Sequence, residues 1–218
     1  MASTSGSEET AVPASRPSLE YAYAFDIAAA GLLSIGSEVL AVCSNPFYRR
    51  EMQHRLCSRG GQDGPVFMTA SEQRIQEVRR FKGGLWAEPE DEDAQVLLHM
   101  LKGCLIPNAP LYVITSGFLA RFLPEWKPGP QEGSLPSRQL LGPGRTAELI
   151  KNSGLSPESV YGFHGPLSIL WGKASRLMAT LGRDDLSDRC LSLMRWNYVS
   201  RSPWWASCPV ALIIARKV

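Results

Sequence analysis

Short apolar runs alternate with segments of helical periodicity along most of the chain. The runs expected to form strands span residues 38–43, 65–69, 84–87, 111–115, 159–163 and 210–215. Several of them are apolar at almost every position, which is typical of strands buried on both faces of a parallel sheet. Because strands that alternate with helices form βαβ units, the pattern predicts a three-layer α/β domain with a mostly parallel sheet.

The expected helices lie between these runs. Residues 21–35 are mostly apolar and are interrupted by Asp26, but a membrane span needs about 20 apolar residues. This segment is therefore expected to be a helix docked on the domain, and no transmembrane segment is predicted. A second helix is expected at 47–58, with Asn45 as its N-cap and Pro46 at its first position. Further helices are expected around 97–101 and at 145–152.

Residues 166–205, which precede the last strand, are interpreted as a helical insertion. Its first part carries an apolar stripe at helical spacing, formed by Leu167, Leu170, Trp171, Ala174, Leu177, Met178 and Leu181. The insertion also carries Trp196, Trp204 and Trp205. We expect the stripe to cover one edge of the sheet. The alternatives are a substrate pocket, a surface for a protein partner or second copy, or contact with a membrane surface.

The remaining segments set the domain boundaries. Residues 1–18 are rich in Ser, Thr, Glu, Ala and Pro and lack apolar periodicity, which predicts a disordered tail. The α/β domain then spans 19–218. Residues 124–144 are dense in Pro, Gly, Ser and Gln, so they are expected to form a long surface loop.

Composition narrows the class of protein only coarsely. An apolar fraction of 44% and a charged fraction of 20% are ordinary for a globular domain, and a net charge of +2 gives no support for nucleic-acid binding. The five cysteines are widely spaced and have no C-x-x-C pair, so neither a metal site nor a disulfide framework is expected. A reducing, cytoplasmic location fits this usage best.

The order of the segments resembles that of class I methyltransferases from about residue 34 to residue 217. The residues that carry the resemblance are FKGGLWAEPEDED, then LKGCLIPNAPLYVIT, which is similar to the turn and strand that follow the family's leucine-rich helix, then SGLSPESVYGFHG and the terminal PVALIIARK. The resemblance implies a Rossmann-like sheet with an antiparallel C-terminal strand. It also implies S-adenosylmethionine as the cofactor.

The chain departs from the family at the loop after the first strand. That loop is glycine-rich in the family, which lets the backbone approach the methionine part of the cofactor. Here it reads Cys43-Ser44-Asn45-Pro46-Phe47, without a glycine. The resemblance implies that Cys43, Ser44 and Asn45 would contact the cofactor.

The family also places an acidic residue after its second strand, where it binds the ribose, and Glu72 is the nearest candidate. The chain between Glu72 and the next expected strand is short. Either one βα unit is missing, or residues 65–69 are the family's third strand and Glu72 has no such role. No metal ligands are identified, and no P-loop, H-E-x-x-H or G-x-G-x-x-G motif is present.

Glu88 stands at the end of a predicted parallel strand, where open α/β sheets bind ligands. It is a candidate for a contact with cofactor or substrate. The favoured interpretation is a solvated acidic turn at the start of a helix, because runs such as EPEDED are usually exposed.

Two functions follow from these observations. The first is an S-adenosylmethionine-dependent methyltransferase-like protein acting on a small or apolar substrate, with Cys43, Ser44, Asn45, Glu72 and Glu88 around the cofactor. The second is a non-catalytic relative that has lost the cofactor and serves as a binding or structural subunit, with a protein partner on the Trp-bearing insertion. The catalytic residues are not identified under either hypothesis.

Overall fold

The computed structural model describes residues 19–36, 38–43, 45–57, 66–68, 80–90, 94–117, 141–163, 166–196, 199–200 and 208–217. Its strands are β1 (Val39–Cys43), β2 (Val66–Met68), β3 (Gly83–Ala87), β4 (Pro110–Ser116), β5 (Leu155–Phe163), β6 (Val199–Ser200) and β7 (Val210–Lys217). Its helices are α1 (Leu19–Leu33), α2 (Pro46–Cys57), α3 (Ala94–Cys104), α4 (Pro143–Asn152), α5 (Pro166–Thr180) and α6 (Asp184–Trp196).

The strands form one seven-stranded sheet in the order β2-β1-β3-β4-β7-β5-β6. The first four strands of this order run parallel to one another, and β7 runs antiparallel to both β4 and β5. The predicted mostly parallel sheet with an antiparallel C-terminal strand is confirmed. Because β2 pairs directly with β1, it takes the place of a second strand, which excludes the interpretation of residues 65–69 as a third strand.

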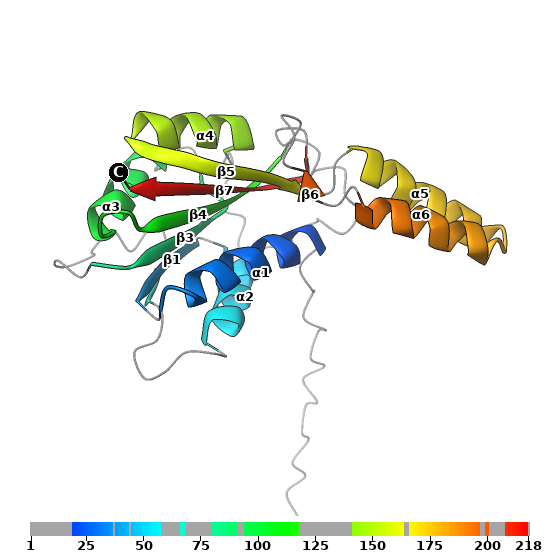
Figure 1. The fold of residues 1–218 in the computed structure, drawn as a ribbon, viewed down its shortest axis with the longest axis horizontal. Helices are drawn as coiled ribbons and strands as arrows, with labels where there is room; N and C mark the ends of the chain where they lie inside the picture. Colours follow the sequence, from blue (N-terminus) through cyan, green and yellow to red (C-terminus); the bar gives the residue numbers. More distant parts are fainter. Residues whose placement is uncertain are drawn as a thin grey trace, which may run out of the picture.

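Helices cover both faces of the sheet and make the three layers (Figure 1). On one face, α1 and α2 bury Phe25, Leu32 and Met52 against inward-facing residues of the strands. On the other face, α3 and α4 bury Leu98 and Ile150. Successive residues of a strand point to opposite faces, so the continuous apolar runs supply both cores.

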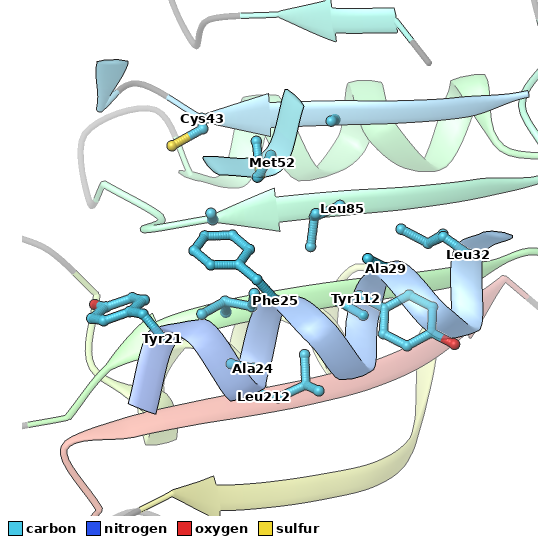
Figure 2. Packing of buried hydrophobic residues seen from close by; sticks show 14 of the residues in the cluster. Tyr21, Ala24, Phe25, Ala29, Leu32, Cys43, Met52, Leu85, Tyr112 and Leu212 are labelled. Atoms are coloured by element: carbon cyan, nitrogen blue, oxygen red, sulfur yellow. The ribbon is translucent and has the colours of Figure 1, made fainter. Parts of the chain in front are cut away.

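The segment expected to dock as a helix forms α1, which lies across the sheet with its apolar side chains toward the strands (Figure 2). Tyr21 lies near one end of this helix and Leu32 near the other. No helix in the described part of the chain is long and apolar enough to span a membrane. None of the five cysteines, all of which lie within the described residues, forms a disulfide bond.

Several boundaries differ from the prediction, and the short strand β6 lies inside residues 166–205, which were expected to be a helical insertion. Strand β5 begins at Leu155, whereas the prediction began it at 159. The earlier part contains exposed polar residues and Pro157, which are not typical of a buried strand. It nevertheless pairs with β7, with an irregularity in register after Pro157. Helix α4 begins at Pro143, inside the predicted loop, because proline at the first helical position has its φ already suited to a helix. Residues 124–140 of that loop, and the predicted tail 1–18, lie outside the described residues.

The interpretation of the apolar stripe as a cover for one edge of the sheet is wrong for its described residues. Helices α5 and α6 pack on each other as a hairpin that extends away from the sheet (Figure 1). Leu170, Leu177 and Leu181 of the stripe are exposed. The periodicity predicted the helix correctly, but it could not show which body the apolar face would meet.

Candidate functional site

The sheet has a topological switch point between β1 and β3. Strand β2, which follows β1 in the chain, lies on one side of β1, and β3 lies on its other side. Open α/β sheets bind ligands in the crevice beyond the carboxyl ends of the strands at such a point. Here Cys43 ends β1 opposite Ala87, the last residue of β3, while Ser116 ends β4.

Glu88 follows β3 and turns inward at this edge. Its side chain is 4% exposed, and Ser116 Oγ donates a hydrogen bond of 2.7 Å to Glu88 Oε1. The Tyr21 hydroxyl, brought by α1, donates to the same oxygen and is also hydrogen-bonded to Ser116 Oγ. Tyr21, Glu88 and Ser116, here called the buried triad, therefore join one helix to two parallel strands.

The backbone of Glu88 is strained. Its φ of 55° lies in the left-handed region, which side chains other than glycine rarely adopt. Such strain costs on the order of 1–3 kcal/mol and persists only where surrounding contacts hold it. The Glu88 amide donates to the Ile114 carbonyl at 2.9 Å. The solvated-turn interpretation is therefore wrong for Glu88, because the hydrogen bonds of the triad pull the carboxyl group into the protein.

Burial dominates the electrostatics of the triad. It raises the pKa of Glu88 from 4.5 to about 7, against a lowering by the hydrogen bonds from Tyr21 and Ser116. Burial and the adjacent Glu88 also raise the pKa of Tyr21 well above its ordinary value. The carboxyl group can therefore hold a proton close to neutral pH, as a general acid or base must.

Aromatic side chains fill the space beside the triad. The Tyr21 ring stacks on Tyr48 of α2 with ring centroids 4.5 Å apart, and Phe25 lies 5.9 Å from the same Tyr48 ring. Tyr21 and Cys43 are buried, and both belong to the apolar cluster drawn in Figure 2. Helix α1 thus packs on one face of the sheet, and its first turn covers the carboxyl ends of β3 and β4.

The chain also returns to this edge after residues 118–140, which are not described. The Leu141 amide donates to the Pro89 carbonyl at 2.8 Å, and the Thr115 hydroxyl donates to the Leu141 carbonyl. Leu141 is therefore held between the neighbours of Glu88 and Ser116. Its side chain belongs to the apolar core on the face of the sheet opposite α1.

The predicted cofactor residues fall into two groups. Cys43 and Asn45 lie together after β1, where the Cys43 thiol donates to the Asn45 carbonyl at 3.4 Å and burial raises the pKa of that thiol to about 12. Glu88 follows the neighbouring strand β3 and lies at the same edge of the sheet. Ser44 and Glu72 are outside the described residues.

Sequence reasoning missed Tyr21 and Ser116 as site residues. Ser116 could have been found, because it directly follows the predicted parallel strand 111–115 at the same edge as Glu88. Tyr21 carries no comparable signal. It stands 67 residues before Glu88 within an apolar segment, and only the docking of α1 brings the two side chains together.

The described residues do not fit S-adenosylmethionine in the arrangement that they adopt. The turn from Cys43 to Pro46 has no glycine, and the Tyr21 ring and hydroxyl occupy the edge that the cofactor would share with Glu88. Among the described residues, no group of three or more His, Cys, Asp or Glu side chains could hold a metal ion.

Comparison with solved structures identifies the fold. The chain aligns with an S-adenosylmethionine-dependent methyltransferase from Thermotoga maritima at a TM-score of 0.51 and 14% identity, over 91% of this chain and 90% of that one. It also aligns with an S-adenosylmethionine-dependent methyltransferase from Mesorhizobium loti (TM-score 0.44, 15% identity, 88% and 97% covered). A mycolic acid cyclopropane synthase complexed with S-adenosylhomocysteine gives a TM-score of 0.48 at 11% identity, with 89% and 84% covered.

No family model and no curated protein matches the chain. At these identities the likeness to solved structures establishes the fold alone. The chain has the class I methyltransferase-like fold, with a Rossmann-like sheet and an antiparallel C-terminal strand. The resemblance inferred from FKGGLWAEPEDED, LKGCLIPNAPLYVIT and PVALIIARK is confirmed at this level.

Proposed function

We propose that this chain is a non-catalytic methyltransferase-like protein that serves as a binding subunit. The observation that supports the proposal is the side chain of Tyr21. It is fully buried, stacks on Tyr48, and uses its hydroxyl to bond both polar groups at the carboxyl ends of β3 and β4.

A cofactor at this edge would have to displace the Tyr21 side chain from the triad, and the free-energy cost of that displacement would lower its affinity. Leaving the triad breaks two buried hydrogen bonds of about 1 kcal/mol each and a stacked aromatic pair of about 1 kcal/mol. A cost of about 3 kcal/mol lowers an affinity roughly 100-fold. The turn after Cys43, which lacks glycine, would add a steric penalty that movement of α1 does not relieve.

A second candidate is an active S-adenosylmethionine-dependent methyltransferase with a small or apolar substrate. Glu88 favours it, because a strained, buried carboxyl group with a pKa of about 7 at a switch point is typical of functional sites. In this case α1 would open, and Cys43, Ser44, Asn45, Glu72 and Glu88 would line the cofactor. The cofactor would supply the methyl group, and these residues would only hold and orient it.

Isothermal titration with S-adenosylmethionine and with S-adenosylhomocysteine separates the two candidates. The proposal expects no binding heat for the wild-type chain or for Tyr21→Ala, because the turn after Cys43 still lacks glycine. Tyr23→Ala is the matched control, since Tyr23 lies on the same helix but is 48% exposed. Circular dichroism establishes that each variant is folded.

Binding by the wild-type chain would support the methyltransferase and contradict the proposal. Binding by Tyr21→Ala alone would also contradict it, because it would show a retained cofactor site beneath α1. A methyl-transfer assay with labelled S-adenosylmethionine would then be the next measurement.

As a binding subunit, the protein would engage its partner through the Trp-bearing insertion at 166–205. The hairpin of α5 and α6 supports this placement, because it extends from the domain (Figure 1) and its leucine side chains are exposed. Trp171 is half-buried within the hairpin. The side chains of Trp196, Trp204 and Trp205 lie outside the described part of the structure.

A further inference from the structure

The hairpin of α5 and α6 has an inner face and an outer face. On the inner face the two helices meet at Ser175 and Ser187, whose buried hydroxyls are hydrogen-bonded at 2.8 Å. This contact fixes which residues of the two antiparallel helices lie at the same level. The small serine side chains also let the helices approach closely.

The outer face of α5 carries an apolar seam formed by Leu170, Ala174, Leu177 and Leu181. The three leucines are 61%, 56% and 63% exposed, although a helix of a single domain normally buries its apolar stripe. Leu181 continues the helical turn, since its amide donates to the Leu177 carbonyl at 3.1 Å. The intervals of four, three and four residues are those of alternating a and d positions in a coiled coil.

We propose that a second copy of this chain docks on the seam, so that the two α5 helices pack antiparallel about a two-fold axis. In this register Leu170 faces Leu181 of the second copy, and Ala174 faces Leu177 of the second copy. Each leucine of the seam then meets an apolar side chain, and the same patch is used on both chains, as a two-fold interface requires. The resulting four-helix arrangement buries the seam completely.

Two pairs of charged residues in the hairpin agree with this register. The Ser175–Ser187 contact sets the level of α6 relative to α5. With the two-fold pairing, Lys173 lies level with Asp184 of the second copy, and Arg176 lies level with Asp188 of the second copy. All four side chains are exposed. Opposite charges at the flanks of a helical seam favour one partner and one orientation.

A membrane surface fits the hairpin less well. Helices that lie on anionic lipid carry a polar face rich in Lys and Arg, whereas Asp184, Asp185 and Asp188 interrupt the basic residues of this hairpin. In this dimer the partner of the proposed binding subunit is a second copy of the same chain, so the inference rests on the proposed function. Its test does not involve S-adenosylmethionine, so the two can fail separately.

Light scattering coupled to size-exclusion chromatography of the full chain tests the dimer. At tens of micromolar, the wild-type protein should show a mass of about 48 kDa, which is twice the 24.0 kDa chain. Leu177→Glu should halve this mass without loss of helical signal, because Leu177 is already exposed in one chain. Val96→Glu on α3 is the matched control, since Val96 is 64% exposed outside the hairpin and its variant should remain dimeric.

A charge exchange tests the orientation. Arg176→Asp should shift the monomer–dimer equilibrium toward monomer by about tenfold, and adding Asp188→Arg in the same chain should restore the dimer. A wild-type monomer at these concentrations, or a dimer unaffected by Leu177→Glu, would overturn the proposal. Binding of a monomeric wild-type chain to phosphatidylserine vesicles would instead assign the seam to a membrane surface.

Discussion

Replacing Glu88 by glutamine should remove a large part of the pH dependence of stability. The folded chain holds a proton on Glu88 up to about pH 7, whereas the unfolded chain releases it near the ordinary value of 4.5. Where the native state binds more protons, stability falls as pH rises. The contribution of Glu88 is therefore fully present below about pH 4.5 and is lost as pH rises through about 7.

The magnitude follows from the separation of these two pKa values, which is about 2.5 pH units. Each unit corresponds to about 1.4 kcal/mol, so ionisation of Glu88 should cost the folded state on the order of 3 kcal/mol by pH 8. That is a large fraction of the roughly 5–15 kcal/mol that stabilises a typical domain. Glutamine keeps an oxygen that can accept from Tyr21 and Ser116 but cannot ionise, so Glu88→Gln should retain its stability.

Urea unfolding between pH 5 and pH 8, followed by circular dichroism, measures the effect. The wild-type free energy of unfolding should fall by about 1.4 kcal/mol per pH unit up to about pH 7, and the Glu88→Gln curve should be nearly flat. Glu148→Gln is the control, because Glu148 is exposed on α4 and should leave the slope unchanged. Equal slopes for the wild type and Glu88→Gln would refute the assignment of a buried, protonated carboxyl group.

Three further changes have outcomes that differ in sign and size. Tyr21→Phe should destabilise the fold by about 1–3 kcal/mol, because Glu88 and Ser116 each lose a buried partner; thermal unfolding at pH 6 measures it. Gly117→Ala should lower the melting temperature sharply or prevent folding, because the new Cβ would lie 1.8 Å from the carbonyl oxygen of Cys208. Gly103→Ala in α3 should stabilise the folded chain by up to about 1 kcal/mol, because alanine favours a helix more than glycine does and nothing lies within 4 Å of the added methyl group. A lower melting temperature for this variant would contradict the packing around α3.

Residue patterns alone predicted most of the sheet. The expected strands at 38–43, 84–87, 111–115 and 210–215 agree with β1, β3, β4 and β7 to within two residues at each end. They could be predicted because a strand buried on both faces is apolar at nearly every position, and such a run can be seen directly in the sequence. The first half of β5 was missed because residues 156–158 are exposed and include Ser156 and Glu158.

The candidate site could be predicted only in part. Cys43 and Asn45 were expected at the carboxyl edge because the resemblance places the cofactor at the loop after the first strand, and Glu88 was expected there because it follows a predicted parallel strand. Ser44 and Glu72 remain predictions, as do the roles of all five residues toward a cofactor. The favoured interpretation placed Glu88 in water, and this was wrong. The composition of an acidic run does not show whether its first residue faces water or the buried hydroxyl groups of Tyr21 and Ser116.

The sequence by itself determined which segments become strands and helices, because periodicity and apolar runs are local properties. Only the tertiary structure decided that α1 carries Tyr21 to Glu88 and Ser116 across 67 and 95 residues of chain. It also decided that the apolar seam of α5 faces away from the sheet. The physical reason is that a periodic stripe shows which face of a helix is apolar, whereas the body that covers this face depends on packing between distant segments.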